Sequence, residues 1–238
     1  MKLEVCVADP QSLAAAIAGG AERIELCSAL ELGGLTPLPG LMALAKASGI
    51  ETYALIRPRS GDFVFDEHDV DAMLRDIDAV RAAGLSGVVL GANHADGRLD
   101  TGVLARLLSH AAGLGSTLHR AIDLVPDFAE ATETAIALGF DRILTSGGAP
   151  TALEGLGQLA LVCATAAGRI KIMAGSGVRP ENVLELLAAV PVDEVHSSCA
   201  GAPAASAEGA VRLGFAAKMK RHTDAAVVRA FRAVLAGA

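Results

Sequence analysis

The stretch from residue 3 to residue 28, LEVCVADPQSLAAAIAGGAERIELCS, contains the unit that decides the fold. A short apolar strand (3–7) is followed by a helical segment that starts at Pro10, because proline is favoured as a first helical residue. A Gly-Gly pair then suits the left-handed turn that ends a helix. A second strand (23–28) follows at once. The stretch therefore predicts a β-strand, α-helix, β-strand unit, which favours parallel strands.

The strand-then-helix unit recurs along the whole chain, as in an alternating α/β fold. The segments with strand character cover residues 3–7, 23–28, 52–57, 87–91, 117–123, 142–146, 170–175 and 194–199. Segments with apolar residues at helical spacing follow them, including residues 10–18, 69–83, 153–166, 182–189 and 224–235. Eight such units predict a (β/α)8 TIM barrel that forms a single domain over residues 1–238. A doubly wound open sheet is the alternative, but it would need fewer units or a longer chain.

Composition restricts the classes of function that the chain can have. It has 238 residues, 52% of them hydrophobic, and a formal net charge of −7. This acidic balance, with few aromatic residues, argues against nucleic acid as a partner. There is no run of about 18 apolar residues and no basic-then-apolar leader, so we expect no membrane partner and no export. The four cysteines form no CxxC pair, which favours reduced thiols and a cytoplasmic protein.

Charged and hydrogen-bonding residues gather at the carboxyl ends of the expected strands, where TIM barrels hold their active sites. Our candidate catalytic residues are Glu25, Arg57, His119, Arg120, Asp123 and His196. A buried charge is costly unless it is paired, so we expect pairing inside the barrel mouth among Glu4, Glu25, Arg57, His119 and His196. We also expect one pocket at this mouth, with Asp123 on its wall, that prefers a small anionic ligand. The alternative is a fully paired polar layer that has no chemical role.

The run Gly175-Ser176-Gly177-Val178-Arg179-Pro180 follows the seventh strand and precedes an expected helix, with Pro180 as its first residue. Backbone N–H groups at such a turn and at a helix start commonly bind phosphate in barrels. Serines after the eighth strand would complete the site. The residues predicted to bind an anionic cofactor or ligand are therefore Gly175, Ser176, Gly177, Ser197 and Ser198. The alternative is that the glycines serve only the tight turn.

Cys6 and Cys27 occupy equivalent positions in the first two strands. Residues two apart in a strand share a face, so Glu4 lies on the face of Cys6 and Glu25 on the face of Cys27. If the strands are parallel neighbours, the two thiols lie close together, and two thiolates suit Cu(I). Cys199, at the end of the eighth strand, is a candidate third sulfur. Zinc would need further ligands, and the alternative to any metal is that both cysteines are small buried apolar residues.

Several longer motifs, in order along nearly the whole chain, resemble those of the CutC copper-homeostasis family. They are EVC (4–6), RIELCS (23–28), GGLTP (33–37), IRPR (56–59), GDF (61–63), LHRAID (118–123), LTSG (144–147) and EVHSS (194–198). The resemblance implies a TIM barrel, a cytoplasmic protein linked to copper homeostasis, and copper binding, as Cu(I), by Cys6 and Cys27. It also implies a homodimer or a higher homo-oligomer, and it assigns no reaction. The alanine- and glycine-rich stretch 201–210, which we expect to be a loop, departs from the family pattern.

Two functions of different classes are therefore open. The first is a cytoplasmic copper-homeostasis protein that binds Cu(I) through Cys6 and Cys27. The second is a TIM-barrel enzyme that acts on a small phosphorylated or carboxylated metabolite at the barrel mouth. No lysine stands at the carboxyl end of a strand, which argues against a Schiff-base aldolase. A purely structural protein would not need this set of charged residues at one rim.

The last expected helix has more apolar residues than one inward-facing stripe needs: Val227, Val228, Phe231, Val234 and Leu235. Such an excess most often forms a broad helix face that packs on the core. The alternative is a contact with a second copy of the chain through a two-fold interface, because a large exposed apolar patch is rare on a monomer.

Overall fold

Within residues 1–237, the part of the chain that the computed structural model describes, eight parallel strands form a closed barrel. Each strand pairs with the next along the chain, and the first pairs with the eighth. The strands are β1 (Lys2–Val7), β2 (Arg23–Leu26), β3 (Thr52–Leu55), β4 (Gly87–Leu90), β5 (Gly115–Leu118), β6 (Arg142–Thr145), β7 (Lys171–Ala174) and β8 (Glu194–Ser197). The predicted TIM barrel is confirmed, and the open sheet is wrong.

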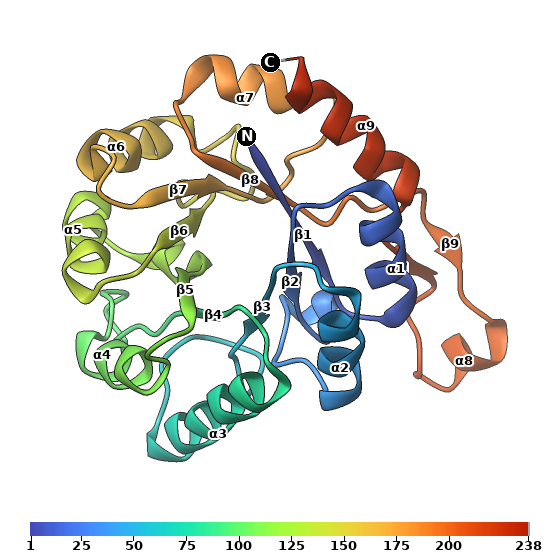
Figure 1. The fold of residues 1–238 in the computed structure, drawn as a ribbon, viewed down its shortest axis with the longest axis horizontal. Helices are drawn as coiled ribbons and strands as arrows, with labels where there is room; N and C mark the ends of the chain where they lie inside the picture. Colours follow the sequence, from blue (N-terminus) through green and yellow to red (C-terminus); the bar gives the residue numbers. More distant parts are fainter. Residues whose placement is uncertain (238) are drawn as a thin grey trace.

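The α-helices that alternate with these strands surround the barrel (Figure 1). They are α1 (Pro10–Gly19), α2 (Pro39–Ser48), α3 (Glu67–Ala83), α4 (Thr101–His110), α5 (Phe128–Leu138), α6 (Leu156–Ala166) and α7 (Val183–Ala189). Local sequence sets their ends. Asp9 caps α1 by accepting a hydrogen bond from Ser12 N, and Gly20 ends it with a left-handed φ of 88°.

The barrel separates an apolar outer core from a polar interior. Alternate residues of β1 face opposite sides, so Leu3, Val5 and Val7 lie in the apolar core between barrel and helices. Glu4 and Cys6, at the intervening positions, face the barrel interior. The reactive polar side chains therefore lie in the barrel interior, and most of the buried apolar side chains lie in the outer core.

Paired charges fill the half of the interior nearest the start of the strands. The fully buried Arg23 donates hydrogen bonds to the carboxylates of Glu4 and Glu194. Arg142 Nε lies 3.4 Å from a Glu194 carboxylate oxygen. The guanidinium groups of Arg23 and Arg142 lie over the Tyr53 ring, 5.5 and 4.7 Å from its centroid. These five residues, which we call the ionic layer, close the barrel beneath its mouth.

The fifth strand is shorter than predicted. It ends at Leu118 instead of continuing to residue 123. The cause is local, because the His119 side chain accepts a hydrogen bond from Ala121 N at 3.1 Å. That bond caps the 3-10 helix η2 (Arg120–Leu124), which turns the chain away from the sheet. Another 3-10 helix, η1 (Leu30–Leu32), follows β2 in a similar position.

The loop between β7 and α7 also differs from the prediction. Pro180 is not the first residue of a helix, because α7 begins only at Val183. Asn182 Oδ1 accepts a hydrogen bond from Arg179 N at 2.8 Å, and its amide nitrogen donates to Gly177 O at 2.9 Å. These bonds hold a turn between the glycine-containing loop and the helix. The expected helix start is therefore separated from Gly177 by that turn.

The last helix, α9 (Ala225–Ala236), packs its apolar side on the barrel. The residues named above for this helix are all buried or half-buried against the outer core: Val227, Val228, Phe231, Val234 and Leu235. The helix approaches α1 closely, and a Cβ at Gly19 would lie 2.4 Å from Val228 Cβ. The helix therefore has the broad core face that the sequence favours, and contact with a second copy stays a prediction.

The stretch expected to be a loop after β8 contains regular structure. β9 (Ala204–Ala205) pairs with β10 (Met219–Lys220), and α8 (Glu208–Arg212) lies between them, outside the ring of helices in Figure 1. We call residues 204–220 the excursion. Its backbone pairs with itself, for example from Ser206 N to Lys218 O at 3.0 Å, so the prediction of an irregular loop is wrong here. Among residues 1–237, no helix has the length and hydropathy that crossing a membrane requires.

Candidate functional site

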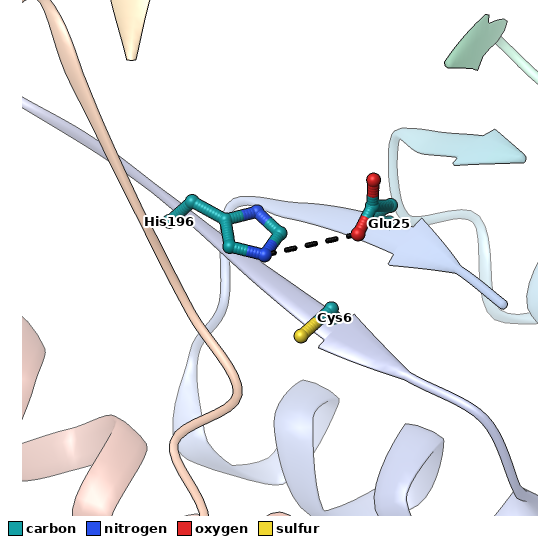
Figure 2. Close-up of side chains that lie close together, drawn as sticks. All are labelled: Cys6, Glu25 and His196. Atoms are coloured by element: carbon teal, nitrogen blue, oxygen red, sulfur yellow. Dashed lines mark ion pairs between the residues drawn. The ribbon is translucent and has the colours of Figure 1, made fainter. Parts of the chain in front are cut away.

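Three side chains from adjacent strands meet at the barrel mouth. Strand register places Cys6 of β1 opposite Glu25 of β2, and Glu4 of β1 opposite His196 of β8. The Cys6 thiol, a Glu25 carboxylate oxygen and a His196 ring nitrogen lie within 4.8 Å of one another, and all three residues are buried. Figure 2 shows these three side chains, which we call the donor cluster, pointing toward a shared centre.

The ionic layer holds the His196 ring in place from below. Nδ1 of His196 lies 2.9 Å from a Glu4 carboxylate oxygen, and Nε2 lies 3.7 Å from a Glu25 oxygen. Burial alone would raise the pKa of Glu4, but the hydrogen bond from His196 and the charge of Arg23 lower it to about 2. The Glu4 carboxylate therefore stays ionised and orients the ring, so that Nε2 faces the donor cluster.

The protonation of the donor cluster reflects its burial and mutual contacts. Burial would lower the pKa of His196, but Cys6, Glu4 and Glu25 together raise it well above its usual 6.5. Burial raises the pKa of Glu25, with the Glu4 charge acting in the same direction and His196 opposing it. The site therefore pairs an imidazole that favours its cationic form with a carboxyl group that holds its proton more readily than usual.

Cys27 lies next to the donor cluster and one step further along the barrel. Its thiol is 3.6 Å from a Glu25 carboxylate oxygen, and the residue is 1% exposed. Burial, and then the Glu25 charge, raise the pKa of the Cys27 thiol well above 9.0. The barrel staggers its strands and puts Cys6 opposite Glu25, so that Cys27 lies beyond the last paired residue of β2. Both cysteines still face the interior, and a shared ligand stays a prediction.

The other two cysteines differ in position. Cys199 follows β8 on the wall of the mouth, with a left-handed φ of 45°. Burial raises the pKa of its thiol to about 11, and Cys6 acts in the same direction. Cys163 lies in α6, outside the barrel, half-buried against the outer core. Cys163 therefore has no part in the mouth.

Arg57 and His119 lie on the opposite side of the mouth and do not form the predicted pairs with carboxylates. Arg57 instead donates to backbone carbonyl oxygens of Leu32, Gly34 and Gly61. These bonds tie together the loops after β2 and β3, since both loops leave carbonyl groups that point at the guanidinium. The prediction that the charged rim residues all pair with one another is therefore wrong for Arg57 and His119.

Asp123 organises a loop and does not line the barrel mouth. Its carboxylate accepts hydrogen bonds from Thr145 Oγ1, Ser146 N and Gly148 N, and it forms an ion pair of 2.7 Å with Arg120. The expectation that Asp123 lines the pocket is wrong, because these bonds draw its side chain into the loop after β6. Asp123 instead fixes Arg120, whose side chain does reach the pocket.

Two cavities that share lining residues open at the mouth. The outer cavity, about 440 Å³, lies between the loops after β7 and β8 and the start of α9. The inner cavity, about 190 Å³, lies on the side of Arg57 and His119 and includes Glu25 on its wall. Cys6, Arg120 and His196 line both cavities. The donor cluster therefore sits where the two spaces meet.

The predicted anion-binding residues fall mostly on the outer cavity. Its wall includes Ser176, Gly177, Ser197 and Ser198. Gly175 does not line it, because a Cβ there would lie 2.6 Å from Leu144 Cδ1, so this glycine serves close packing inside the barrel. The Ser197 hydroxyl donates to Val178 O at 2.8 Å and therefore holds the loop.

The comparisons agree with this architecture. The chain matches the CutC family profile over residues 1–201. The chain belongs to the CutC family. A CutC family protein from Sinorhizobium medicae is 59% identical over 98% of this chain and 95% of its own length. One from Caulobacter vibrioides is 54% identical over 98% and 97%.

Solved structures extend the comparison of CutC with other barrels. A candidate copper homeostasis protein CutC from Streptococcus agalactiae superposes with a TM-score of 0.79, at 30% identity, over 83% of this chain and 98% of that chain. N-(5'-phosphoribosyl)anthranilate isomerase from Pyrococcus furiosus covers the whole of both chains with a TM-score of 0.61 at 14% identity. The second likeness shows the fold alone.

Two residues of the mouth were missed by the sequence reasoning. Arg179 and Arg221 line the outer cavity. Arg179 stands inside the glycine-containing run after β7, so its position there was a usable signal. Arg221 follows the excursion and lies beyond residues 1–201, where the CutC profile ends, and no local pattern connects it to the barrel mouth.

Proposed function

We propose that this chain is a cytoplasmic copper-homeostasis protein that binds Cu(I) in its barrel mouth through Cys6 and Cys27, with His196 as an additional ligand. One observation carries the proposal, namely that the donor atoms of Cys6, Glu25 and His196 lie within 4.8 Å of one another in a buried site, which Cys27 borders with its thiol 3.6 Å from a Glu25 carboxylate oxygen. The copper homeostasis name of the Streptococcus agalactiae relative supports the choice of metal.

The chemistry of the donor set fits a soft monovalent metal. Thiolate sulfur and imidazole nitrogen suit Cu(I), whereas a carboxylate oxygen suits harder ions. The Glu4 carboxylate, 2.9 Å from His196 Nδ1, is the kind of outer partner that orients a ligating imidazole. Cys27 would have to lose its proton to the solvent to bind as a thiolate, so binding releases a proton and weakens in acid.

The test is an anaerobic Cu(I) titration of the reduced protein against a chromophoric chelator. Cys6→Ser is expected to abolish tight binding, and Cys27→Ser and His196→Asn to weaken it. Cys163→Ser is the matched control, because that thiol lies in α6, outside the mouth. Unchanged affinity in both Cys6→Ser and Cys27→Ser would contradict the proposal, and loss in Cys27→Ser alone would move the site away from the donor cluster.

A second candidate function is favoured by a separate observation. The imidazole of His196 lies between the Glu4 carboxylate and the Cys6 thiol, and the cavities on both sides reach this point. An imidazole that favours its cationic form, oriented by a carboxylate and set beside a thiol and the Glu25 carboxyl group, suits acid–base chemistry. We therefore propose, as the alternative, an enzyme that acts on a small phosphorylated or carboxylated metabolite.

Proton exchange in D2O tests this alternative without knowledge of the product. The protein is incubated with a panel of small organic phosphates and carboxylates, and ¹H NMR follows the loss of C–H signals. Exchange that disappears in Glu25→Gln and persists in Cys163→Ser supports an enzyme. Absence of exchange with every member of the panel would count against it.

A further inference from the structure

The wall of the outer cavity is unusually basic for an acidic protein. Its volume of about 440 Å³ falls within the range of small-molecule sites. Arginines reach it from three separate segments: Arg120 after β5, Arg179 after β7, and Arg221 after the excursion. The wall contains a single carboxylate, Glu181. Three guanidinium groups and one carboxylate make the cavity attractive to an anion.

Two of these arginines are not neutralised by the protein. Arg120 forms an ion pair with Asp123. For Arg179 and Arg221, no carboxylate oxygen of residues 1–237 lies within the 4.0 Å range of an ion pair. Both side chains belong to exposed residues at the outer edge of the cavity, whereas Cys6 and His196 are buried at its inner end. An anionic group at the outer edge would therefore meet unpaired positive charge.

The loop after β7 adds backbone donors to the same wall. Ser176 and Gly177 have left-handed φ values of 73° and 72°. Within the described chain, the N–H groups of Gly177 and Val178 donate to no protein acceptor. The Ser176 hydroxyl donates to Pro150 O at 2.6 Å and so fixes the loop. Free backbone N–H groups beside arginines suit the oxygens of a phosphate group.

The inner cavity is lined by side chains whose nitrogen atoms are not all hydrogen-bonded. His119 Nδ1 accepts a hydrogen bond from Ala121 N, so the proton of the neutral ring is on Nε2. Among the described residues, His119 Nε2 and Arg57 Nε are buried without a hydrogen-bond partner, as are Arg142 Nε in the ionic layer and three atoms elsewhere. His119 and Arg57 are each 5% exposed and line the inner cavity. A ligand oxygen in this cavity would supply the acceptor that these two donors lack.

We propose that the two cavities together bind a small organic phosphate monoester that carries a hydroxyl or carbonyl oxygen. The phosphate lies between Arg179, Arg221 and the N–H groups of Gly177 and Val178. The second oxygen accepts a hydrogen bond from His119 Nε2. This inference rests on the second candidate function only in placing a small molecule in the mouth, and it requires neither turnover nor copper.

Calorimetry on the metal-free, reduced protein tests the inference, with glycerol 3-phosphate, inorganic phosphate and glycerol as probes. Glycerol 3-phosphate is expected to bind with a Kd of about 1 mM or tighter, more tightly than inorganic phosphate, and glycerol to show no binding. Arg179→Gln and Arg221→Gln should each weaken both phosphate probes about tenfold, since each removes a charge-assisted contact. Arg212→Gln is the matched control, because Arg212 is exposed in α8 and does not line the cavity.

The inner cavity is tested with a pair of variants at His119. His119→Asn keeps an acceptor near the Nδ1 position and removes the Nε2 donor, so it should weaken glycerol 3-phosphate and leave inorganic phosphate unchanged. His119→Gln, which restores a donor near the Nε2 position, should recover part of the affinity. Circular dichroism and thermal melts confirm that each variant is folded before its affinity is interpreted.

Three results would overturn the inference. The first is a Kd above about 10 mM for both phosphate probes. The second is an equal loss of affinity in Arg212→Gln and Arg221→Gln, which would reduce the effect to overall charge. The third is an equal response of the two phosphate probes to His119→Asn. Cys27→Ser should weaken Cu(I) binding and leave phosphate binding unchanged, because Cys27 lines neither cavity, so failure of this inference is distinguishable from failure of the copper proposal.

Discussion

The two halves of the barrel interior are built from similar charged residues, but they differ in whether those charges have opposite partners. In the ionic layer, each charged group of Glu4, Arg23, Arg142 and Glu194 lies within 4.0 Å of an opposite charge. In the mouth, Arg57 donates to backbone carbonyl oxygens and lies over the Phe63 ring, without a carboxylate partner among the described residues. A layer whose charges neutralise one another is structural even though Arg142 Nε lacks a hydrogen bond, whereas a mouth that leaves a charge without an opposite partner is prepared for a ligand.

The largest effect is expected from breaking the ionic layer. Arg23→Met removes the cation between Glu4 and Glu194 and leaves two carboxylates buried, so it should lower the free energy of unfolding by about 3–5 kcal/mol. Arg75→Met is the control, because Arg75 pairs with Asp71 on the exposed face of α3 and should cost at most about 0.5 kcal/mol. Urea unfolding measures both. Equal losses would erase the distinction between a paired layer and an exposed pair.

His119 in the mouth should make the stability of the protein depend on pH. Burial, and then the charge of Arg57, lower the pKa of His119 to about 3, from 6.5 in the unfolded chain. Between these values the unfolded state binds a proton that the folded state does not, so stability is complete above about pH 6.5 and falls as the pH drops toward 3. Thermal melts from pH 7 to pH 4 should show a shallower decline for His119→Asn than for the unaltered protein. Parallel curves would mean that His119 does not titrate as a buried neutral group.

A smaller effect on stability is expected when a side chain is introduced beside the His119 ring. A Cβ at Gly91 would lie 2.2 Å from His119 Cε1, so Gly91→Ala should displace the ring and cost about 1–3 kcal/mol. Gly157→Ala in α6 is the control, because nothing lies within 4 Å of a Cβ built at Gly157. This substitution should be neutral or stabilising by up to about 1 kcal/mol. Urea unfolding compares the two, and equal stability would show that the mouth adapts freely.

The smallest effect on stability is expected outside the barrel. The homodimer implied by the CutC resemblance stays a prediction, and most of the apolar side of α9 packs on the barrel. Phe215, 80% exposed in the excursion, is the most exposed large apolar residue of the described chain. Phe215→Ser should change the free energy of unfolding by less than about 0.5 kcal/mol.

Light scattering of the unaltered protein should give twice 24.1 kDa, and a mass of 24.1 kDa at every concentration would end the dimer prediction.

Short-range patterns in the sequence were enough to predict the barrel. Strand propensity, helical spacing and the Gly-Gly turn act over a few residues, and the repetition of the unit leaves few topologies available. Boundaries failed where a side chain competed with the backbone, as His119 does at the end of β5 and Asn182 does before α7. These side-chain bonds depend on local geometry that apolar spacing does not encode.

The sequence by itself determined the fold class, the polar strand ends and the inward position of Cys6, because strand alternation has a period of two. Only the tertiary structure decided the partner of Cys6. Closure of the barrel joins β1 to β8 and brings His196 beside a residue that is 190 positions away in the sequence, and the stagger of the strands sets Glu25 opposite Cys6. Shear and closure are properties of all the strands together, so no single segment can specify them. For the same reason Arg221 reaches the mouth only through the path of the excursion.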